Sequence, residues 1–237
     1  MRSLRVRARE PELMDLPDSD PVLYAQTVAQ FAFVNRWLTR ARHLLKRHIV
    51  HDMQANPSRH YHMVELGAGG CETAAWLLEH CRRCGLKLRM SAIDHDPRAI
   101  EFARARYGDV DGLSIIQGDI VKMKDVGSFE FFYANHLLHH LENDQIVELF
   151  AILREHPEAG IIINDIHRTR SAYIGYHVFS AILLRHSFAR YDGLLSIRKG
   201  FRKEELEELA RAADPDSADR YRVKCIPPAR VVIYSRR

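Results

Sequence analysis

The chain has 237 residues, of which 46% are hydrophobic and 28% charged, an ordinary balance for a globular protein with one sizeable core. Its 35 Lys and Arg residues exceed its 31 Asp and Glu residues by only four, and they are scattered, which makes a nucleic-acid partner unlikely. No apolar run approaches the roughly 20 residues that span a bilayer, and none resembles a secretory leader. We therefore expect a cytoplasmic protein, either a monomer or a homodimer.

The four cysteines lack the spacing of a disulfide framework. Cys81 and Cys84 have the C-x-x-C spacing of zinc and redox motifs, but they lie in a helical stretch and no second pair completes a tetrahedral site. We expect structural thiols and no metal.

Residues 1–60 are predicted to form an N-terminal arm and a helical cap. The first 20 residues are charged and contain two prolines, which favours a loop or a draping arm. Asp20 followed by Pro21 is typical of a helix start, and apolar residues then recur at helical spacing through about Ile49. Two helices are expected here, with the position of the break between them left open.

Residues 61–237 are predicted to form one domain in which short apolar strands alternate with helices. Strands are expected near residues 63–69, 86–94, 113–120, 129–135 and 159–166, with helices near 72–84, 97–107 and 143–156. This alternation predicts an α/β, Rossmann-like, doubly wound parallel sheet whose ligands bind at the carboxyl ends of the strands.

The last third departs from the alternation. A helical insertion is expected at about residues 171–190, then a helix at 203–213 and two β-rich runs separated by Pro227–Pro228. Strands joined by so tight a connection are antiparallel. The prediction is therefore a seven-stranded sheet with six parallel strands and an antiparallel last strand.

The strongest motif is the glycine-rich turn Glu65-Leu66-Gly67-Ala68-Gly69-Gly70 between the first strand and its helix. Glycines permit a tight turn and close approach of a ligand to the backbone. A dinucleotide-binding dehydrogenase would need Gly or Ala at the sixth position of GxGxxG, where this chain has Glu72. The acidic Glu65 also suits a cationic amine better than a pyrophosphate.

Polar residues follow the next three strands in order. Asp94 ends the second strand, where an acid can accept hydrogen bonds from ribose hydroxyls, and Asp119 with Ile120 follows the third. Asn135 and His136 close the fourth. Asp94 and Asp96 could instead cap the next helix, and for Asp96 capping is the expected role.

These elements resemble the class I S-adenosylmethionine (SAM)-dependent methyltransferases, with Cys71 at the third glycine position as a departure. The resemblance implies SAM as cofactor and S-adenosylhomocysteine (SAH) as product. It places the methionine part beside Glu65, Gly67, Ala68 and Gly69, the ribose at Asp94 and the adenine near Asp119. The full expected set of cofactor-binding residues is Glu65, Gly67, Ala68, Gly69, Asp94, His95, Asp119, Ile120, Asn135, His136 and Arg36, the last for the methionine carboxylate.

Histidines are dense just after the fourth and fifth strands. Imidazole titrates near neutrality, which suits deprotonation of a phenol. The segment LLHHL resembles one that carries a His pair in several small-molecule O-methyltransferases, with an acid after the fifth strand. The candidate catalytic residues are His140 or His139 as base, Asp165 to orient the base or the substrate, and His167. A backbone-bonded role at a helix start is the alternative for each histidine.

The segments PELMD, INDIHR and RYDGLLSIRKGFRKEEL further resemble bacterial methyltransferases associated with type III polyketide synthases. That resemblance implies a small, partly apolar aromatic substrate. The insertion Ala172–Phe188, rich in Tyr, Phe, Ile, Val and Leu, could roof its pocket, pack on the sheet or touch a membrane surface. Arg168, Arg170, Asp192 and Arg198 are further candidates on the substrate side.

Two other readings remain open. Methylation of nitrogen or carbon, or of a macromolecule, is less favoured because Asn135 is followed by His136 and not by the Pro-Pro of amino-group methyltransferases. A SAM-binding protein without catalysis is the alternative from another class.

Overall fold

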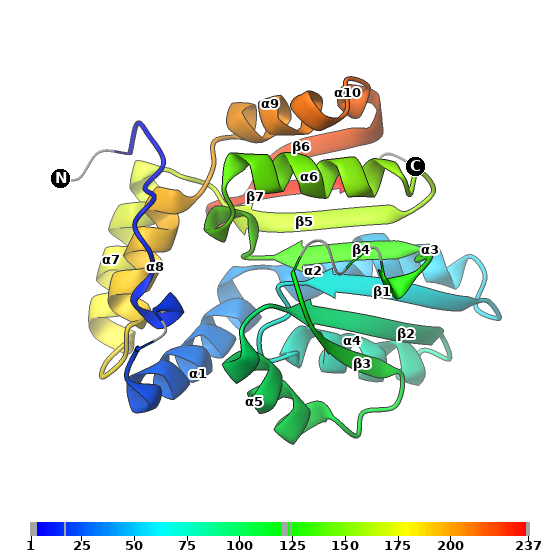
Figure 1. Ribbon diagram of the computed structural model, residues 1–237, viewed down its shortest axis with the longest axis horizontal. Helices are drawn as coiled ribbons and strands as arrows, with labels where there is room; N and C mark the ends of the chain where they lie inside the picture. The colour runs from blue at the N-terminus through cyan, green and yellow to red at the C-terminus, as the bar shows by residue number, and fades with distance from the viewer. Residues whose placement is uncertain (1–3, 17, 120–122, 124, 236–237) are drawn as a thin grey trace.

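The computed structural model describes residues 4–16, 18–119, 123 and 125–235, and within α1 it leaves the side chains of residues 32 and 34–37 undescribed. A central sheet carries helices on both faces (Figure 1). The strands are β1 (His60–Leu66), β2 (Lys87–Asp94), β3 (Leu113–Gln117), β4 (Phe131–Asn135), β5 (Gly160–Ile166), β6 (Tyr221–Ile226) and β7 (Arg230–Ser235).

The sheet has the order β3-β2-β1-β4-β5-β7-β6. Strands β1 to β5 pair in parallel, whereas β7 runs antiparallel to both β5 and β6. Six strands therefore share one direction and the last opposes them, which confirms the predicted doubly wound sheet. The order reverses between β1 and β4, the position where such sheets leave a crevice for ligands.

The N-terminal region consists mainly of helices, and part of it packs in the core of the protein. Its elements are η1 (Leu13–Asp15), α1 (Pro21–Leu38), α2 (Ala41–Leu45), η2 (Lys46–Val50) and α3 (His51–Gln54). Asp20 caps α1 as expected, accepting hydrogen bonds from the backbone N–H groups of Val22 and Leu23. Leu45, Ile49 and Met53 are fully buried, so this segment covers one face of the sheet.

The remaining helices are α4 (Glu72–Arg83), α5 (Pro97–Tyr107), η4 (Leu138–His140), α6 (Asn143–Arg154), α7 (Arg170–Leu183), α8 (Ala189–Lys199), α9 (Lys203–Ala213) and α10 (Ser217–Arg220). The predicted insertion at residues 171–190 is thus larger than expected. Its second helix, α8, continues to Lys199, and Gly200 follows it. None of the described helices is both long enough and apolar enough to cross a bilayer.

Two cores lie on opposite faces of the sheet because successive strand residues point to opposite sides. Phe132, Ile163 and Ile233 pack on one face with α6 and α9, whereas Phe131, Tyr133 and Ile162 pack on the other with α2, η2 and α4. Parallel strands buried on both faces explain the continuous apolar runs of the sequence.

The N-terminal arm, residues 4–16, is held along α8 by backbone contacts. The N–H groups of Leu13 and Met14 donate to the carboxylate of Asp192, at 2.7 and 3.1 Å. The N–H of Ala8 donates to the carbonyl of Arg198. In Figure 1 this arm, α7 and α8 lie together beyond one end of the sheet, the end to which β1 to β5 point.

Candidate active site

A cavity of about 1230 Å³ opens at the carboxyl ends of the parallel strands. Its walls come from the arm, α1, the β1–α4 turn, the ends of β2 and β4, α5, η4, α7, α8 and the β6–β7 turn. Pockets for one small ligand measure about 300–1,000 Å³, so this volume has room for a cofactor and a second molecule.

The glycine-rich turn forms the floor of the cavity. Gly67 and Gly69 have φ values of 71° and 52°, in the left-handed region that glycine adopts without cost. A Cβ at Gly67 would lie 2.8 Å from Cδ1 of Leu137, so a side chain there would collide. Cys71, the departure from the expected glycine, is also left-handed with φ 59° and is buried. The turn keeps its shape despite the substitution.

Asp94 closes this turn from the end of β2. Its Oδ2 accepts the N–H of Gly69 at 2.7 Å and its Oδ1 accepts the N–H of Asp96 at 3.0 Å. His95 stands beside it, with Nδ1 3.7 Å from Asp94 Oδ1. Asp94 and His95 both line the cavity.

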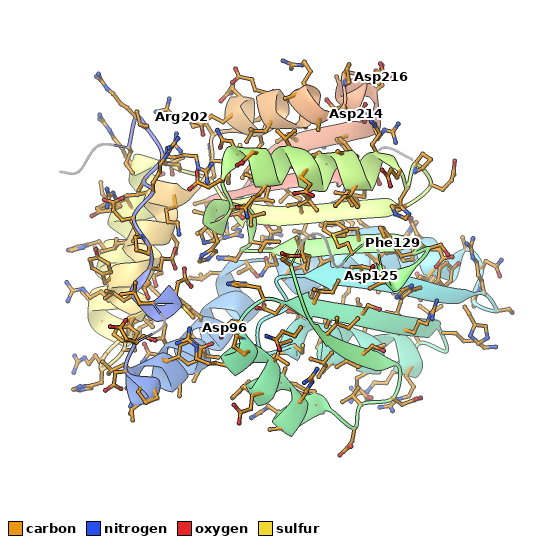
Figure 2. The ribbon with its side chains drawn as sticks, in the orientation of Figure 1. Asp96, Asp125, Phe129, Arg202, Asp214 and Asp216 are labelled. Atoms are coloured by element: carbon orange, nitrogen blue, oxygen red, sulfur yellow. The ribbon has the colours of Figure 1, made fainter. Side chains whose placement is uncertain are left out.

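Asp96 caps α5 as expected and also anchors α1. Its Oδ1 accepts the N–H of Arg98, and its Oδ2 accepts the guanidinium of Arg98 and the hydroxyl of Tyr24. Figure 2 labels Asp96 where α1 and α5 approach each other. The carboxylate of Asp96 therefore holds α1 against the start of α5 at the wall of the cavity.

Glu65 is a buried acid that lines the cavity. Its side chain is buried, and its Oε2 has no hydrogen-bond partner among the described residues. Burial, with Asp94 and Glu72 nearby, raises its pKa to about 8. An unpartnered carboxyl group facing a cavity needs a cationic or hydrogen-bonding ligand, and the methionine ammonium of SAM fits that requirement.

His139 and Asp165 form a buried pair at the other half of the cavity. Nδ1 of His139 lies 2.7 Å from Oδ1 of Asp165, and both side chains are at most 2% exposed. Burial raises the pKa of Asp165, but His139, His136 and Arg230 outweigh it and hold that pKa well below its usual range. Burial lowers the pKa of His139, so near neutrality its ring is neutral with Nδ1–H donating to Asp165.

His140 is arranged differently. Its Nδ1 lies 3.0 Å from Oδ2 of Asp15. Burial lowers the pKa of His140, but Glu12 and Asp15 outweigh it and raise that pKa above its ordinary value. Because the pKa of His140 is raised and that of His139 is lowered, a smaller fraction of His140 is in the neutral form that can accept a proton near neutral pH.

The arm contributes residues that the sequence did not single out. Glu12 is 1% exposed, and its Oε1 lies 2.9 Å from Oγ of Ser196, 3.5 Å from Nζ of Lys199 and 3.8 Å from Nε2 of His139. Asp15 and Met14 also line the cavity. The motif PELMD was noted for its resemblance, but no local signal indicates that it reaches α8 and η4.

Glu12, His139 and His140 form one group within the described part of the chain that could hold a metal ion, with ligand atoms within 4.8 Å of one another. The ammonium of Lys199 already supplies a cation beside Glu12. Cys81 is buried and Cys84 is exposed, and neither belongs to this group.

Several expected residues lie elsewhere. His167 does not line the cavity; its Nε2 lies 3.7 Å from Sγ of Cys225, because β5 has ended and the chain turns toward the edge strands. Asp119 is exposed and outside the cavity lining. Ile120 and the side chain of Arg36 fall outside the described residues.

The helical insertion is divided between two surfaces. Tyr176 and Phe179 line the cavity as expected, but Ile174, Val178, Ile182 and Leu183 point outward and are more than half exposed. Helical geometry places Ile174, Val178 and Ile182 on the face of α7 opposite to Tyr176 and Phe179, whereas Leu183 is exposed because it is the last residue of the helix. Among the charged candidates for the substrate side, Arg168 and Asp192 are buried structural partners, with Arg168 bonded to Gly200 and Glu205.

Comparison with known proteins gives one family match. Residues 63–160 match the model of a family described as a methyltransferase domain. No curated protein matches the sequence. The family match covers β1 to the start of β5 and includes the glycine-rich turn, Asp94, Glu65 and the His139 segment.

Solved structures share the fold at low sequence identity. The plantazolicin methyltransferase BamL, solved with a substrate analogue and SAH, has a TM-score of 0.67 at 13% identity, covering 90% of this chain and 91% of that one. A SAM-dependent methyltransferase from Aquifex aeolicus has a TM-score of 0.58 at 13% identity, covering 88% and 95%. Human N-acetylserotonin methyltransferase with SAM has a TM-score of 0.58 at 15% identity, covering 90% of this chain but 55% of that one.

The doubly wound sheet with its antiparallel last strand, the glycine-rich turn at its switch point and the family match agree with one another. Residues 63–160 therefore form a methyltransferase domain of the Rossmann-like, SAM-dependent type, and SAM is its cofactor.

Proposed function

We propose that the enzyme methylates a hydroxyl oxygen of a small, partly apolar aromatic molecule. The observation that carries this proposal is His139 in the wall of the cavity, a neutral imidazole held in one orientation by the buried carboxylate of Asp165 behind it. A phenol must lose a proton to become a good nucleophile, and such an imidazole is suited to take it.

The cofactor half would bind SAM with the residues that surround the glycine-rich turn. Glu65 would accept the methionine ammonium, the backbone of Gly67, Ala68 and Gly69 would lie against the methionine part, and Asp94 with His95 would face the ribose. Asn135 and His136, which line the cavity at the end of β4, would border the reacting methyl group. Roles for Asp119 and Ile120 near the adenine rest on the family resemblance alone.

Bound SAM supplies an electrophilic methyl group. His139 would remove the proton of the acceptor hydroxyl at Nε2 while Asp165 accepts the hydrogen bond of Nδ1–H. The acceptor O–H bond would break, the acceptor oxygen would bond to the methyl carbon as the S–CH₃ bond breaks and SAH leaves, and the proton would remain on His139. Glu12, 3.8 Å from Nε2, would stabilise the imidazolium that results.

The acceptor half favours an aromatic, partly apolar molecule. Met14, Tyr176 and Phe179 provide apolar and aromatic surface on the side of the arm and α7. Gly175 also lines this region, and a Cβ built on it meets nothing within 4 Å. The space beside α7 is therefore open to a ring or a short apolar chain.

The experiment is methyl transfer from SAM to a panel of phenols, aromatic amines and enolisable aromatic ketones, with the product bond assigned by NMR. The proposal expects methyl ethers from the phenols. Methylation of nitrogen or carbon alone would contradict it in favour of the other enzymatic reading. Transfer to none of these classes by a protein that binds SAM would contradict the small-aromatic proposal.

A further inference from the structure

Arg230 is a buried cation that faces the cavity; Asp165 acts on it electrostatically, but Arg230 forms no ion pair with a carboxylate of the described residues. Only 4% of the residue is exposed, and it lines the cavity from the first position of β7. Its Nε donates to Oδ1 of Asn164 at 3.1 Å, whereas its Nη2 has no hydrogen-bond partner among the described residues. A buried guanidinium nitrogen left unpaired is costly unless a ligand pairs with it.

The surroundings of Arg230 are a built polar network. Nδ2 of Asn164 donates to Oδ1 of Asn135 and to the backbone carbonyl of Thr39, both at 2.8 Å. These contacts join β4, β5, β7 and the end of α1 in one place. Because Asn164 is fully buried and bonded on both sides, the guanidinium is held in position before any ligand arrives.

Arg230 lies on the same face of the sheet as Glu65. Val232, two residues along β7, packs in the core on that face, as do Met63 and Tyr133. Tyr133 on β4 pairs directly with Glu65 on β1. Burial raises the pKa of the Tyr133 hydroxyl group, the nearby charge of Glu65 raises it further, and that of Arg230 lowers it. Glu65 Oε2 and Arg230 Nη2, both without a hydrogen-bond partner in the described part of the chain, thus lie on the face of the sheet that carries Tyr133.

We propose that Arg230 binds the carboxylate of the cofactor's methionine, opposite Glu65, which takes its ammonium. An α-amino acid presents both charges on one carbon, and each would pair with the group of opposite charge. This inference rests on SAM binding in the cavity, as the proposed function does. It assigns to a residue of β7 the role that the sequence suggested for Arg36 on α1.

The test compares two ligands on purified protein by calorimetry. SAM carries the carboxylate, whereas decarboxylated SAM lacks it and retains the ammonium. For Arg230→Gln we expect SAM to bind about 10- to 100-fold more weakly, the value of one charge-assisted hydrogen bond, and decarboxylated SAM to bind as it does to the wild type. Glu65→Gln should weaken the binding of both ligands, because both carry the ammonium.

Controls separate a local effect from damage to the fold. Arg168→Gln removes another buried arginine, one outside the cavity lining, and should leave the ratio of the two affinities unchanged. If Arg230→Gln does not fold, Arg230→Lys keeps the charge without the planar fork, and a reduced preference for SAM over its decarboxylated form is the expected result.

An equal loss of affinity for SAM and for decarboxylated SAM in a folded Arg230 variant would overturn the inference. It would also be overturned if Arg36→Gln lost the preference for SAM over decarboxylated SAM while Arg230→Gln kept it. Either result leaves the proposed function intact. Failure of the wild type to bind SAM at all would instead remove the proposed function, and the two failures are therefore distinguishable.

Discussion

The cofactor half and the acceptor half of the cavity are assembled in different ways. The cofactor half is built from residues that directly follow strands, so that Glu65, Gly69 and Asp94 come together as soon as β1 and β2 pair. The acceptor half depends on contacts between distant parts of the chain, such as Glu12 with Ser196 and Asp15 with His140. The first half follows from the doubly wound sheet itself, whereas the second requires the arm and α8 to dock on it.

This contrast predicts that substitutions in the two halves separate binding from turnover. Removing a group from the cofactor half should weaken SAM binding. Removing a group from the acceptor half should reduce turnover or acceptor affinity while SAM binds as before. The following predictions run from the largest expected effect to the smallest.

Asp165→Asn is expected to reduce kcat by about 10²- to 10⁴-fold, the range of general base catalysis, because the amide no longer orients a neutral His139 as a base. SAM affinity should stay within about twofold. The measurement is steady-state methyl transfer together with calorimetry, and His167→Ala, at the same end of β5 but outside the cavity lining, is the control. A variant that keeps full activity would remove Asp165 from the mechanism.

Glu65→Gln should weaken SAM binding by about 10- to 100-fold, since a charged partner of the ammonium is lost. In the wild type, Glu65 is protonated below its pKa of about 8, so SAM binding at pH 7 should release a proton and tighten as the pH rises toward 8. Calorimetry in two buffers with different ionisation enthalpies measures that release. Glu130→Gln, remote from the cavity lining, should retain it, and an unchanged release in Glu65→Gln would contradict the assignment.

The same group links pH to stability without ligand. The unfolded chain loses the Glu65 proton near pH 4.5 and the folded protein near pH 8, so the folded state binds more protons between these values. The contribution of Glu65 to the free energy of unfolding therefore falls as the pH rises from about 4.5 to about 8. Chemical denaturation at several pH values in this range should show that the free energy of unfolding falls less steeply with pH in Glu65→Gln than in the wild type. Equal dependence of the free energy of unfolding on pH in the two proteins would contradict the burial of this carboxyl group.

Glu12→Gln should lower kcat by about tenfold, because one charge-assisted contact to the His139 imidazolium is lost, and leave SAM affinity unchanged. The free energy of unfolding should also fall by about 1–3 kcal/mol, since buried Lys199 loses its charged partner. Glu10→Gln, which changes an exposed carboxylate on the same arm, is the matched control. Equal kinetic effects of the two changes would show that the arm acts without Glu12.

Gly175→Phe should raise KM several-fold for bulky acceptors while small acceptors and SAM are unaffected, because the new side chain enters open space beside α7. Gly193→Ala, in contrast, changes a glycine that has no free space around it. Its Cβ would lie 2.1 Å from Oη of Tyr176, so this change should destabilise the protein instead. A Gly175 variant with unchanged KM for every acceptor would place the acceptor elsewhere in the cavity.

The sequence was sufficient to predict the sheet and the glycine-rich turn beside Asp94, because both follow from local patterns. Alternating apolar runs predict the strands, and Gly67 with Asp94 lies at strand ends that a doubly wound sheet must bring together. Glu12 and Lys199 are far apart in the sequence, and no periodic pattern of residues predicts that they form an ion pair. The orientation of α7, which turns Tyr176 inward and Ile174 outward, likewise depends on packing against α8.

The central claim, that a neutral His139 takes the proton of an acceptor hydroxyl, is tested most directly by the pH dependence of kcat. Because the pKa of His139 is lowered below its ordinary 6.5, the rate should reach its plateau below neutral pH and fall only at lower pH, as the imidazole becomes protonated. His139→Ala should lose most of the activity, and its remaining kcat should no longer fall at low pH in this way. An acidic limb that persists unchanged in His139→Ala, at an undiminished rate, would contradict the account.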